Sequence, residues 1–165
     1  HLMMHTEYAD LVAVIKKQCA EYVKGNKGVK ISNVMLIDEL FMEFDVVLIK
    51  RMLNILFTNS QKFAAKNCHI SVGLIRKDNG NVQIQVADNG IGVADEYKPH
   101  MFDHTAGVDE LELALVKDII VAHGGTIEVK DNPGGGTIMV IDLPAKGMVE
   151  EAEIMDDDHA DDEIK

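Results

Sequence analysis

The stretch ALVKDIIVAHGGTIEVKDNPGGGTIMVIDLP, residues 114–144, decides the fold of this chain. From Leu111 to Ala122 apolar residues recur every three or four positions, which predicts a helix that ends at the following Gly-Gly pair. Two β-rich runs, 126–131 and 137–144, follow on either side of NPGGG and predict an antiparallel hairpin. A helix and a hairpin therefore close the domain.

The N-terminal half begins with two more helical patterns. Apolar residues at helical spacing predict helices at 8–24 and 44–65, and Asp45 can cap the second one. The run 29–36 between them reads as a strand, and the KDNG turn joins strands 69–76 and 81–88 into a further hairpin.

The order helix, strand, helix, hairpin, loop, helix, hairpin predicts an α+β fold, a two-layer α/β sandwich. We expect a mixed, mostly antiparallel sheet with the helices on one face. The irregular stretch 89–107 is long for a loop in a compact domain, which favours a functional role for it.

The composition excludes several classes of protein. A chain of 165 residues that is 47% hydrophobic suits one domain with a core. It has no apolar run of about 18 residues and no signal peptide pattern, so we expect a cytoplasmic protein, or the cytoplasmic part of a membrane sensor, without membrane contact. No basic stripe points to nucleic acid. Cys19 and Cys68 form no CxxC pair, which favours reduced, buried thiols.

The formal net charge of −12 is unevenly distributed. Residues 149–165 hold nine acidic residues and one lysine, a net charge of −8, which leaves −4 for the rest. We therefore expect a cloning remnant or disordered start at 1–6, one domain at 7–146, and an acidic disordered tail or linker at 147–165. A metal-binding or docking role for DDDHADDE is the alternative to a solvated charge run.

Two polar groups stand out. Asp88 ends a predicted strand and is followed by Gly90 and Gly92, so its carboxylate can accept a hydrogen bond from a buried amine such as that of a purine. An ordinary turn explains this pattern equally well.

Asn59 and Lys62 share one face of the second long helix. They could hold a hydrated magnesium ion with its phosphates, or form a solvated polar stripe.

The combination resembles a known family. Asn59 with Lys62 and Phe63, then DNGIG, then PHMF, then the 114–144 stretch resemble, in this order, the catalytic ATP-binding domain of sensor histidine kinases, a Bergerat-fold ATPase domain related to gyrase and heat-shock chaperones. The resemblance covers 8–144. It implies binding of ATP and Mg²⁺, phosphoryl transfer to a histidine on a separate phosphoacceptor domain, and a downstream response regulator or receiver domain as partner.

The resemblance also implies roles for single residues. It assigns Asn59 to magnesium and Lys62 to the nucleotide phosphates. It assigns the adenine end to five residues: the amine acceptor Asp88, the glycines Gly90 and Gly92 that let the backbone pass the base, the first aromatic of the phenylalanine box, Phe102, and the adenine-fixing Thr137.

The chain departs from the family at the phosphate end. Ile55 stands where the family usually has an acidic or amide side chain, which speaks against an ATP-hydrolysing motor. Thr105 replaces the second aromatic, and Glu110 and Glu112 stand where a longer lid ends in Gly-x-Gly. Carboxylates near a triphosphate are repulsive, so we expect weakened binding of Mg-ATP.

Three hypotheses remain open at this point. The first is the ATP-binding part of a histidine kinase, with no catalytic residue assigned and the phosphoacceptor histidine on another domain or partner. The second is a degenerate, non-catalytic module of the same fold that acts in regulation or docking. The third, which matches the 114–125 stretch less well, is an anti-sigma-factor serine kinase.

Overall fold

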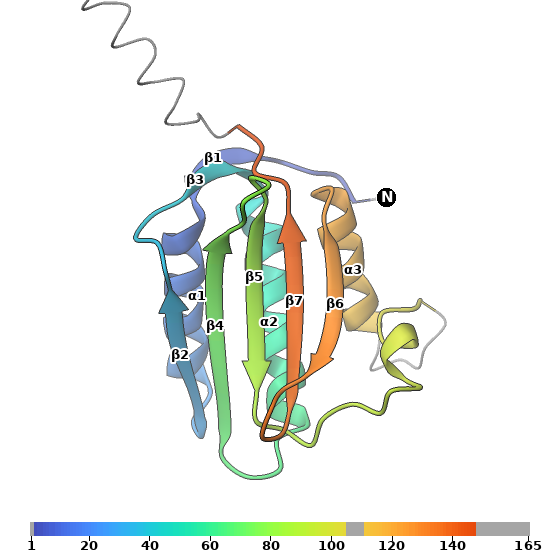
Figure 1. Ribbon diagram of the computed structural model, residues 1–165. Helices are drawn as coiled ribbons and strands as arrows, with labels where there is room; N and C mark the ends of the chain where they lie inside the picture. The colour runs from blue at the N-terminus through green and yellow to red at the C-terminus, as the bar shows by residue number, and fades with distance from the viewer. Residues whose placement is uncertain (1, 105–110, 148–165) are drawn as a thin grey trace, which may run out of the picture.

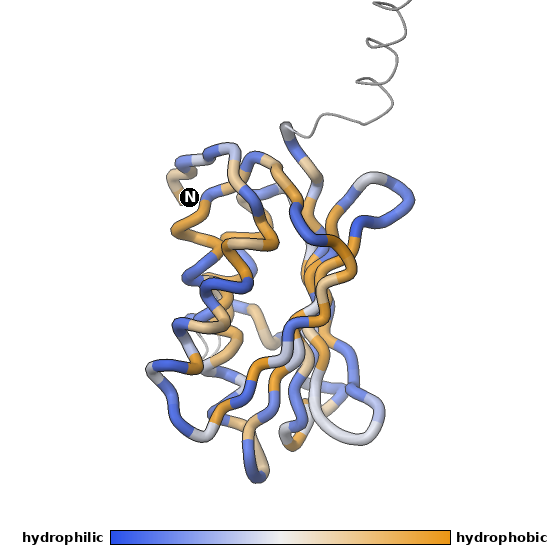
Figure 2. The backbone as a smooth tube through the Cα atoms, turned by 90° about the vertical axis from the view of Figure 1, so that its left-hand side faces the viewer, coloured by the Kyte–Doolittle hydropathy of each residue, from blue (hydrophilic) through white to orange (hydrophobic). Residues whose placement is uncertain are grey.

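The computed structural model describes residues 2–104 and 111–147. In this part of the chain, helices α1 (Leu11–Gly25), α2 (Val46–Lys62) and α3 (Leu111–Ala122) lie on one face of a sheet (Figure 1). Figure 2 shows the two layers edge-on. None of these helices combines the length and the apolar character of a membrane span.

The main sheet is mixed, as predicted. Its strands follow the order β2-β4-β5-β7-β6, in which β2 runs parallel to β4 and the other neighbours are antiparallel. The bounds of these strands are β2 Val29–Met35, β4 Cys68–Arg76, β5 Val82–Asp88, β6 Thr126–Asp131 and β7 Thr137–Leu143. Both predicted hairpins, β4–β5 and β6–β7, are present, and the α+β sandwich is confirmed.

A second, two-stranded sheet was not predicted. It pairs β1 (Glu7–Asp10) with β3 (Phe41–Phe44). The prediction of a helix from residue 8 was therefore wrong at its start, because Asp10 accepts a hydrogen bond from the Val12 amide and caps a helix that begins at Leu11. Each strand has only four residues, so neither shows a readable alternating pattern.

The second long helix is shorter than predicted, but its cap is confirmed. The Asp45 carboxylate accepts a hydrogen bond from the Leu48 amide at 3.0 Å. The same carboxylate accepts from the His5 amide, so His5 lies against the domain at this point. The Asp45 amide donates to Nε2 of the buried His123, whose Nδ1 lies 2.8 Å from the Ile119 carbonyl oxygen. Residues 123 and 45 thus tie the end of α3 to the start of α2.

The core lies between the layers and fixes the place of the site. Inward-facing residues of β4 and β5 pair in register, as Val72 with Val86 and Leu74 with Ile84, and pack under α2, where Phe57 is fully buried. Burying each such side chain contributes about 1.5–3 kcal/mol. This packing brings the end of β5 beside the C-terminal half of α2.

Cys19 and Cys68 are buried and form no disulfide, as expected. Burial raises the pKa of the Cys19 thiol to about 12. The predictions for Thr105, Glu110 and the acidic tail lie outside the described residues, and the domain boundaries at 6 and 146 stay predictions.

Candidate functional site

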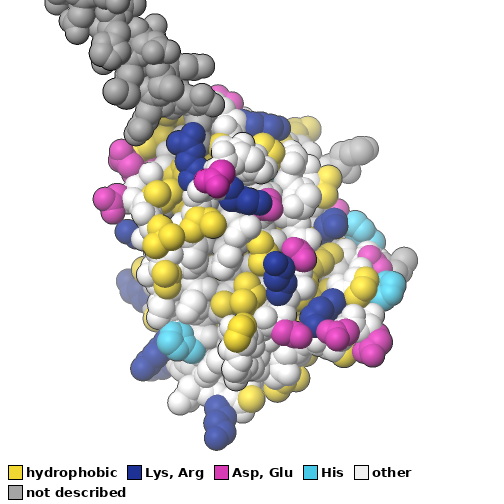
Figure 3. Space-filling view, in the orientation of Figure 1, with side chains coloured by type: hydrophobic (Ala, Val, Ile, Leu, Met, Phe, Trp, Pro, Cys, Tyr) yellow, Lys and Arg dark blue, Asp and Glu magenta, His cyan; other side chains and the backbone are white. Residues whose placement is uncertain are grey.

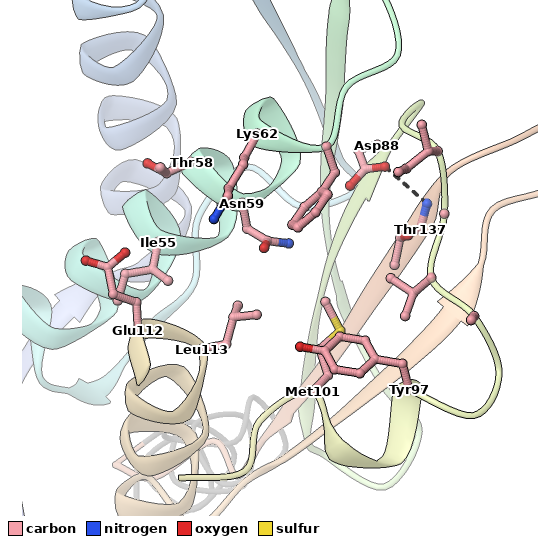
Figure 4. Close-up of a pocket in the computed structure, with 15 residues that line it drawn as sticks. Ile55, Thr58, Asn59, Lys62, Asp88, Tyr97, Met101, Glu112, Leu113 and Thr137 are labelled. Carbon is pink, nitrogen blue, oxygen red and sulfur yellow. Dashed lines mark hydrogen bonds between the residues drawn. The ribbon is translucent and has the colours of Figure 1, made fainter. Parts of the chain in front are cut away.

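A cavity of about 790 Å³ opens between the C-terminal half of α2, the end of β5, the segment after β5 and the start of α3 (Figure 4). Five of the seven predicted site residues line it: Asn59, Lys62, Asp88, Gly92 and Thr137. They come from positions far apart in the sequence, so the fold gathers the polar groups that the sequence singled out. Gly90 and Phe102 do not line the cavity.

Asp88 is held by three hydrogen-bond donors. Its Oδ1 accepts from the amides of Gly90 at 2.9 Å and Thr137 at 3.1 Å, and its Oδ2 accepts from the Ser60 hydroxyl at 2.9 Å. A carboxylate has about four lone-pair positions, so Asp88, which lines the cavity, retains acceptor capacity. Asp88 is therefore a fixed acceptor for an N–H group of a ligand.

Two glycines permit the close backbone approaches around this acceptor. A Cβ on Gly136, which has a φ of +105°, would lie 2.0 Å from the Asp88 carbonyl oxygen. A Cβ on Gly90 would lie 2.8 Å from the Phe63 carbonyl oxygen, to which the Ile91 amide donates. Gly90 thus acts by letting the chain pass the end of α2. The sequence predicts only a turn at Gly136 and gives no sign of this close approach.

The other end of the cavity carries the groups suited to phosphates. Asn59 and Lys62 both line it from α2, and the Lys62 Nζ lies 5.7 Å from the centre of the Phe63 ring. Figure 4 shows both side chains on the cavity side of the helix. The donor set fits magnesium, because a neutral amide oxygen is a suitable ligand for an ion that keeps most of its waters.

Two of the four predicted departures from the family, Ile55 and Glu112, also lie at the cavity. Ile55 is 8% exposed and offers no oxygen. Glu112, in the first turn of α3, lines the same wall, and Figure 4 shows its carboxylate beside Ile55. One carboxylate therefore faces the region where phosphates would lie.

The wall opposite α2 was largely missed. Met101, which is 2% exposed, and Tyr97 line the cavity in place of the expected Phe102, which packs partly buried against the core. The length of the stretch 89–107 predicts a functional role for it, but its residues show no period that would indicate which of them face inward.

A lysine holds this wall to the sheet. Lys98 of the short 3₁₀ helix η1 (Lys98–His100) lies with Nζ 2.8 Å from an Asp131 oxygen and also pairs with Asp95. Hydrogen bonds to Asp131 and Asp95 raise the pKa of Lys98. The segment after β5 is thereby fixed to the end of β6.

The fold and the cavity define a nucleotide-binding domain of the α/β sandwich type. The sequence pattern of the family described as histidine kinase-, DNA gyrase B-, and HSP90-like ATPase matches residues 44–147, so this chain belongs to that family. Within it, the chain is an ATP-binding catalytic domain of the histidine kinase type.

Two similar sequences belong to sensor proteins. The sensor protein CiaH of Streptococcus pneumoniae is 36% identical over 109 residues, and the sensor histidine kinase YkoH of Bacillus subtilis is 32% identical over 114 residues. These alignments cover 60% and 63% of this chain, but only 24% of either relative. The chain thus matches about a quarter of the length of such proteins.

Solved structures share the fold. A mycobacterial sensor histidine kinase, MprB, superposes with a TM-score of 0.74 at 21% identity, covering 87% of this chain and 100% of that one. Full-length ShkA in complex with AMPPNP superposes with a TM-score of 0.78 at 22% identity, covering 90% of this chain and 33% of that one.

Proposed function

We propose that this domain binds Mg-ATP in the cavity and delivers the γ-phosphoryl group to a histidine on a separate phosphoacceptor domain. The observation that carries the proposal is Asp88, a carboxylate fixed by three donors in a cavity that also holds Asn59 and Lys62. An amine acceptor, a magnesium ligand and a cation are the groups that an adenine nucleotide needs.

Each residue then has one task. Asp88 accepts from the adenine amine, Asn59 offers its oxygen to the hydrated metal ion, and the Lys62 ammonium stabilises the phosphate charge. Bound Mg²⁺ would neutralise charge on the transferred group. Phosphoryl transfer needs positioning and charge stabilisation more than it needs a protein base.

Ile55 favours transfer over hydrolysis. It lies one helical turn before Asn59 on the cavity wall and cannot activate water. A domain of this kind would keep ATP intact until an acceptor side chain reaches the γ-phosphate. The acceptor histidine then passes the phosphoryl group on to a response regulator, a partner class with which the histidine kinase ThkA forms a solved complex.

Calorimetry with AMPPNP, with and without Mg²⁺, tests the binding part of this proposal. We expect binding that strengthens when Mg²⁺ is added. Absence of heat and of a thermal shift would instead support a non-catalytic module of the same fold, in which Glu112 keeps phosphates out.

A transfer assay tests the chemistry. The domain is mixed in trans with a phosphoacceptor domain of a sensor kinase and with ATP labelled at the γ-phosphate. We expect acid-labile, base-stable label on the acceptor. Acid-stable label would point to a serine-directed kinase, the third hypothesis.

A further inference from the structure

The first two helices carry a charge opposite to that of the whole chain. The sequences of α1 and α2 contain six basic residues and one acidic residue, Glu21, whereas the protein has a net charge of −12. On the sheet face turned to the viewer in Figure 3, basic and acidic side chains are mixed. Helices α1 and α2 therefore carry a net positive charge in a protein that is acidic as a whole.

Four of these cations lie at the same level of two adjacent helices. Gln18 donates to Asn54 at 2.6 Å and Tyr22 donates to Gln61 at 2.7 Å, so α1 and α2 run parallel and side by side. The four cations precede the Gln18–Asn54 contact in their helices by about one turn or less. They are Lys16, Lys17, Lys50 and Arg51, which we call the basic helix surface.

These side chains have no acidic partner among the described residues. Three of the four are exposed and Lys50 is half-buried. Every ion pair found between described residues involves other cations: Lys77, Lys98, Lys130, His100 and His104.

The acidic C-terminal segment leaves the described structure close to this surface. The Glu43 amide donates to the Lys146 carbonyl oxygen at 2.8 Å, and Glu43 lies three residues before α2 begins. Lys50 and Arg51 lie about 6–8 Å along the axis of α2 from its first residue, Val46. Residues 148–165 could span about 60 Å when extended, so they can reach the whole surface.

We propose that the acidic segment 148–165 docks on the basic helix surface of its own chain. The segment carries a net charge of −8, and its covalent attachment near the surface gives it a high effective concentration. The contact is electrostatic and therefore salt-dependent, since the Debye length falls from about 30 Å at 0.01 M to about 3 Å at 1 M salt. Docking would occupy the outer face of α2, the helix that also carries Asn59 and Lys62.

Paramagnetic broadening in the whole chain tests this proposal. A spin label is attached through Ala160→Cys, while Cys19 and Cys68 are buried and stay unlabelled. At about 0.02 M salt we expect amide signals in the first halves of α1 and α2 to broaden at least about twofold more than those of β6, and this excess to vanish at about 0.5 M salt. The double variant Lys17→Glu with Arg51→Glu should abolish the excess.

The control reverses two exposed cations of the sheet, Lys30→Glu with Lys130→Glu, and should leave the broadening of α1 and α2 unchanged. Uniform broadening over the domain, or broadening that survives the Lys17 and Arg51 reversals, would overturn the proposal. A mixture of spin-labelled chains without ¹⁵N and ¹⁵N-enriched chains without the label reports only contacts between molecules. Equal broadening of the α1 and α2 signals in this mixture would show docking between molecules and overturn the intramolecular contact. Because none of these readouts requires nucleotide, they are independent of the proposed kinase activity.

Discussion

At the scale of single residues, the site depends on how Asp88 is held. Two backbone amides and one hydroxyl orient its carboxylate, so the acceptor is in place before a ligand arrives. The sequence could indicate Asp88, because it follows a clear strand pattern and precedes two glycines. It could not indicate Ser60, because a small polar residue on a helix gives no sign of its partner across 28 positions.

We predict that Ser60→Ala lowers the affinity for Mg-AMPPNP by about two- to tenfold. The variant removes one of the three hydrogen bonds that orient the Asp88 carboxylate and leaves the other two donors in place, so binding loses only part of the about 1.5–3 kcal/mol of a hydrogen bond to a charged group. Calorimetry measures the change, and Ser71→Ala on β4 is the matched control. An unchanged affinity would mean that the amides alone fix the carboxylate.

Gly136→Ala should destabilise the domain more than Gly80→Ala. Both glycines have a positive φ, but a Cβ on Gly80 meets nothing within 4 Å, whereas one on Gly136 meets the Asp88 carbonyl oxygen at 2.0 Å. We expect the Gly80 variant to lose about 1–2 kcal/mol of unfolding free energy from its backbone conformation. Urea unfolding compares the two, and equal losses would show that the tight approach at Gly136 relaxes without strain.

At the scale of the elements, local signals explain what the sequence predicted. The β4–β5 and β6–β7 hairpins were found because each pairs neighbouring strands through a short turn. The β1–β3 pair was missed because it joins Glu7 to Phe44 across a helix and a strand. The cavity wall at Tyr97 and Met101 was missed because an irregular segment takes its shape from tertiary contacts such as the Lys98–Asp131 ion pair.

The cap of α2 gives a pH prediction. Burial raises the pKa of Asp45, but hydrogen bonds from the His5 and Leu48 amides outweigh it and lower the pKa below its ordinary value of 3.8. A lowered folded pKa contributes stability that is present above the unfolded value and lost as the pH falls through the folded one.

We therefore expect Asp45→Asn to be less stable than the parent at neutral pH and to lose less stability on acidification below about pH 4. Urea unfolding at neutral and acid pH measures this, with the exposed Asp78→Asn as control. Parallel pH curves for the parent and the Asp45 variant would show that the cap has no share in acid unfolding.

At the scale of the whole molecule, the cavity and the basic helix surface lie in different places. The cavity proposed to bind nucleotide lies between α2, α3 and the segment after β5, whereas the basic helix surface lies on the outer side of α1 and α2. Sequence motifs predicted most of the polar residues that line the cavity, because these residues lie on or directly after helices and strands that the sequence pattern indicates. The basic surface was not predicted, because it exists only once α1 and α2 lie side by side.

The most direct test of the account is the affinity of Asp88→Asn for Mg-AMPPNP. An asparagine can still accept from the Gly90 and Thr137 amides through its oxygen, but it places a donor where the adenine amine needs an acceptor. The control is Asp142→Asn, on β7 beside Lys77 and outside the cavity lining.

We predict that calorimetry shows binding by the parent and by the Asp142 variant, and an affinity lower by about ten- to a hundredfold for the Asp88 variant, as expected for a hydrogen bond to a charged group. Equal affinities of the parent and a folded Asp88→Asn variant would contradict the assignment of this cavity to adenine.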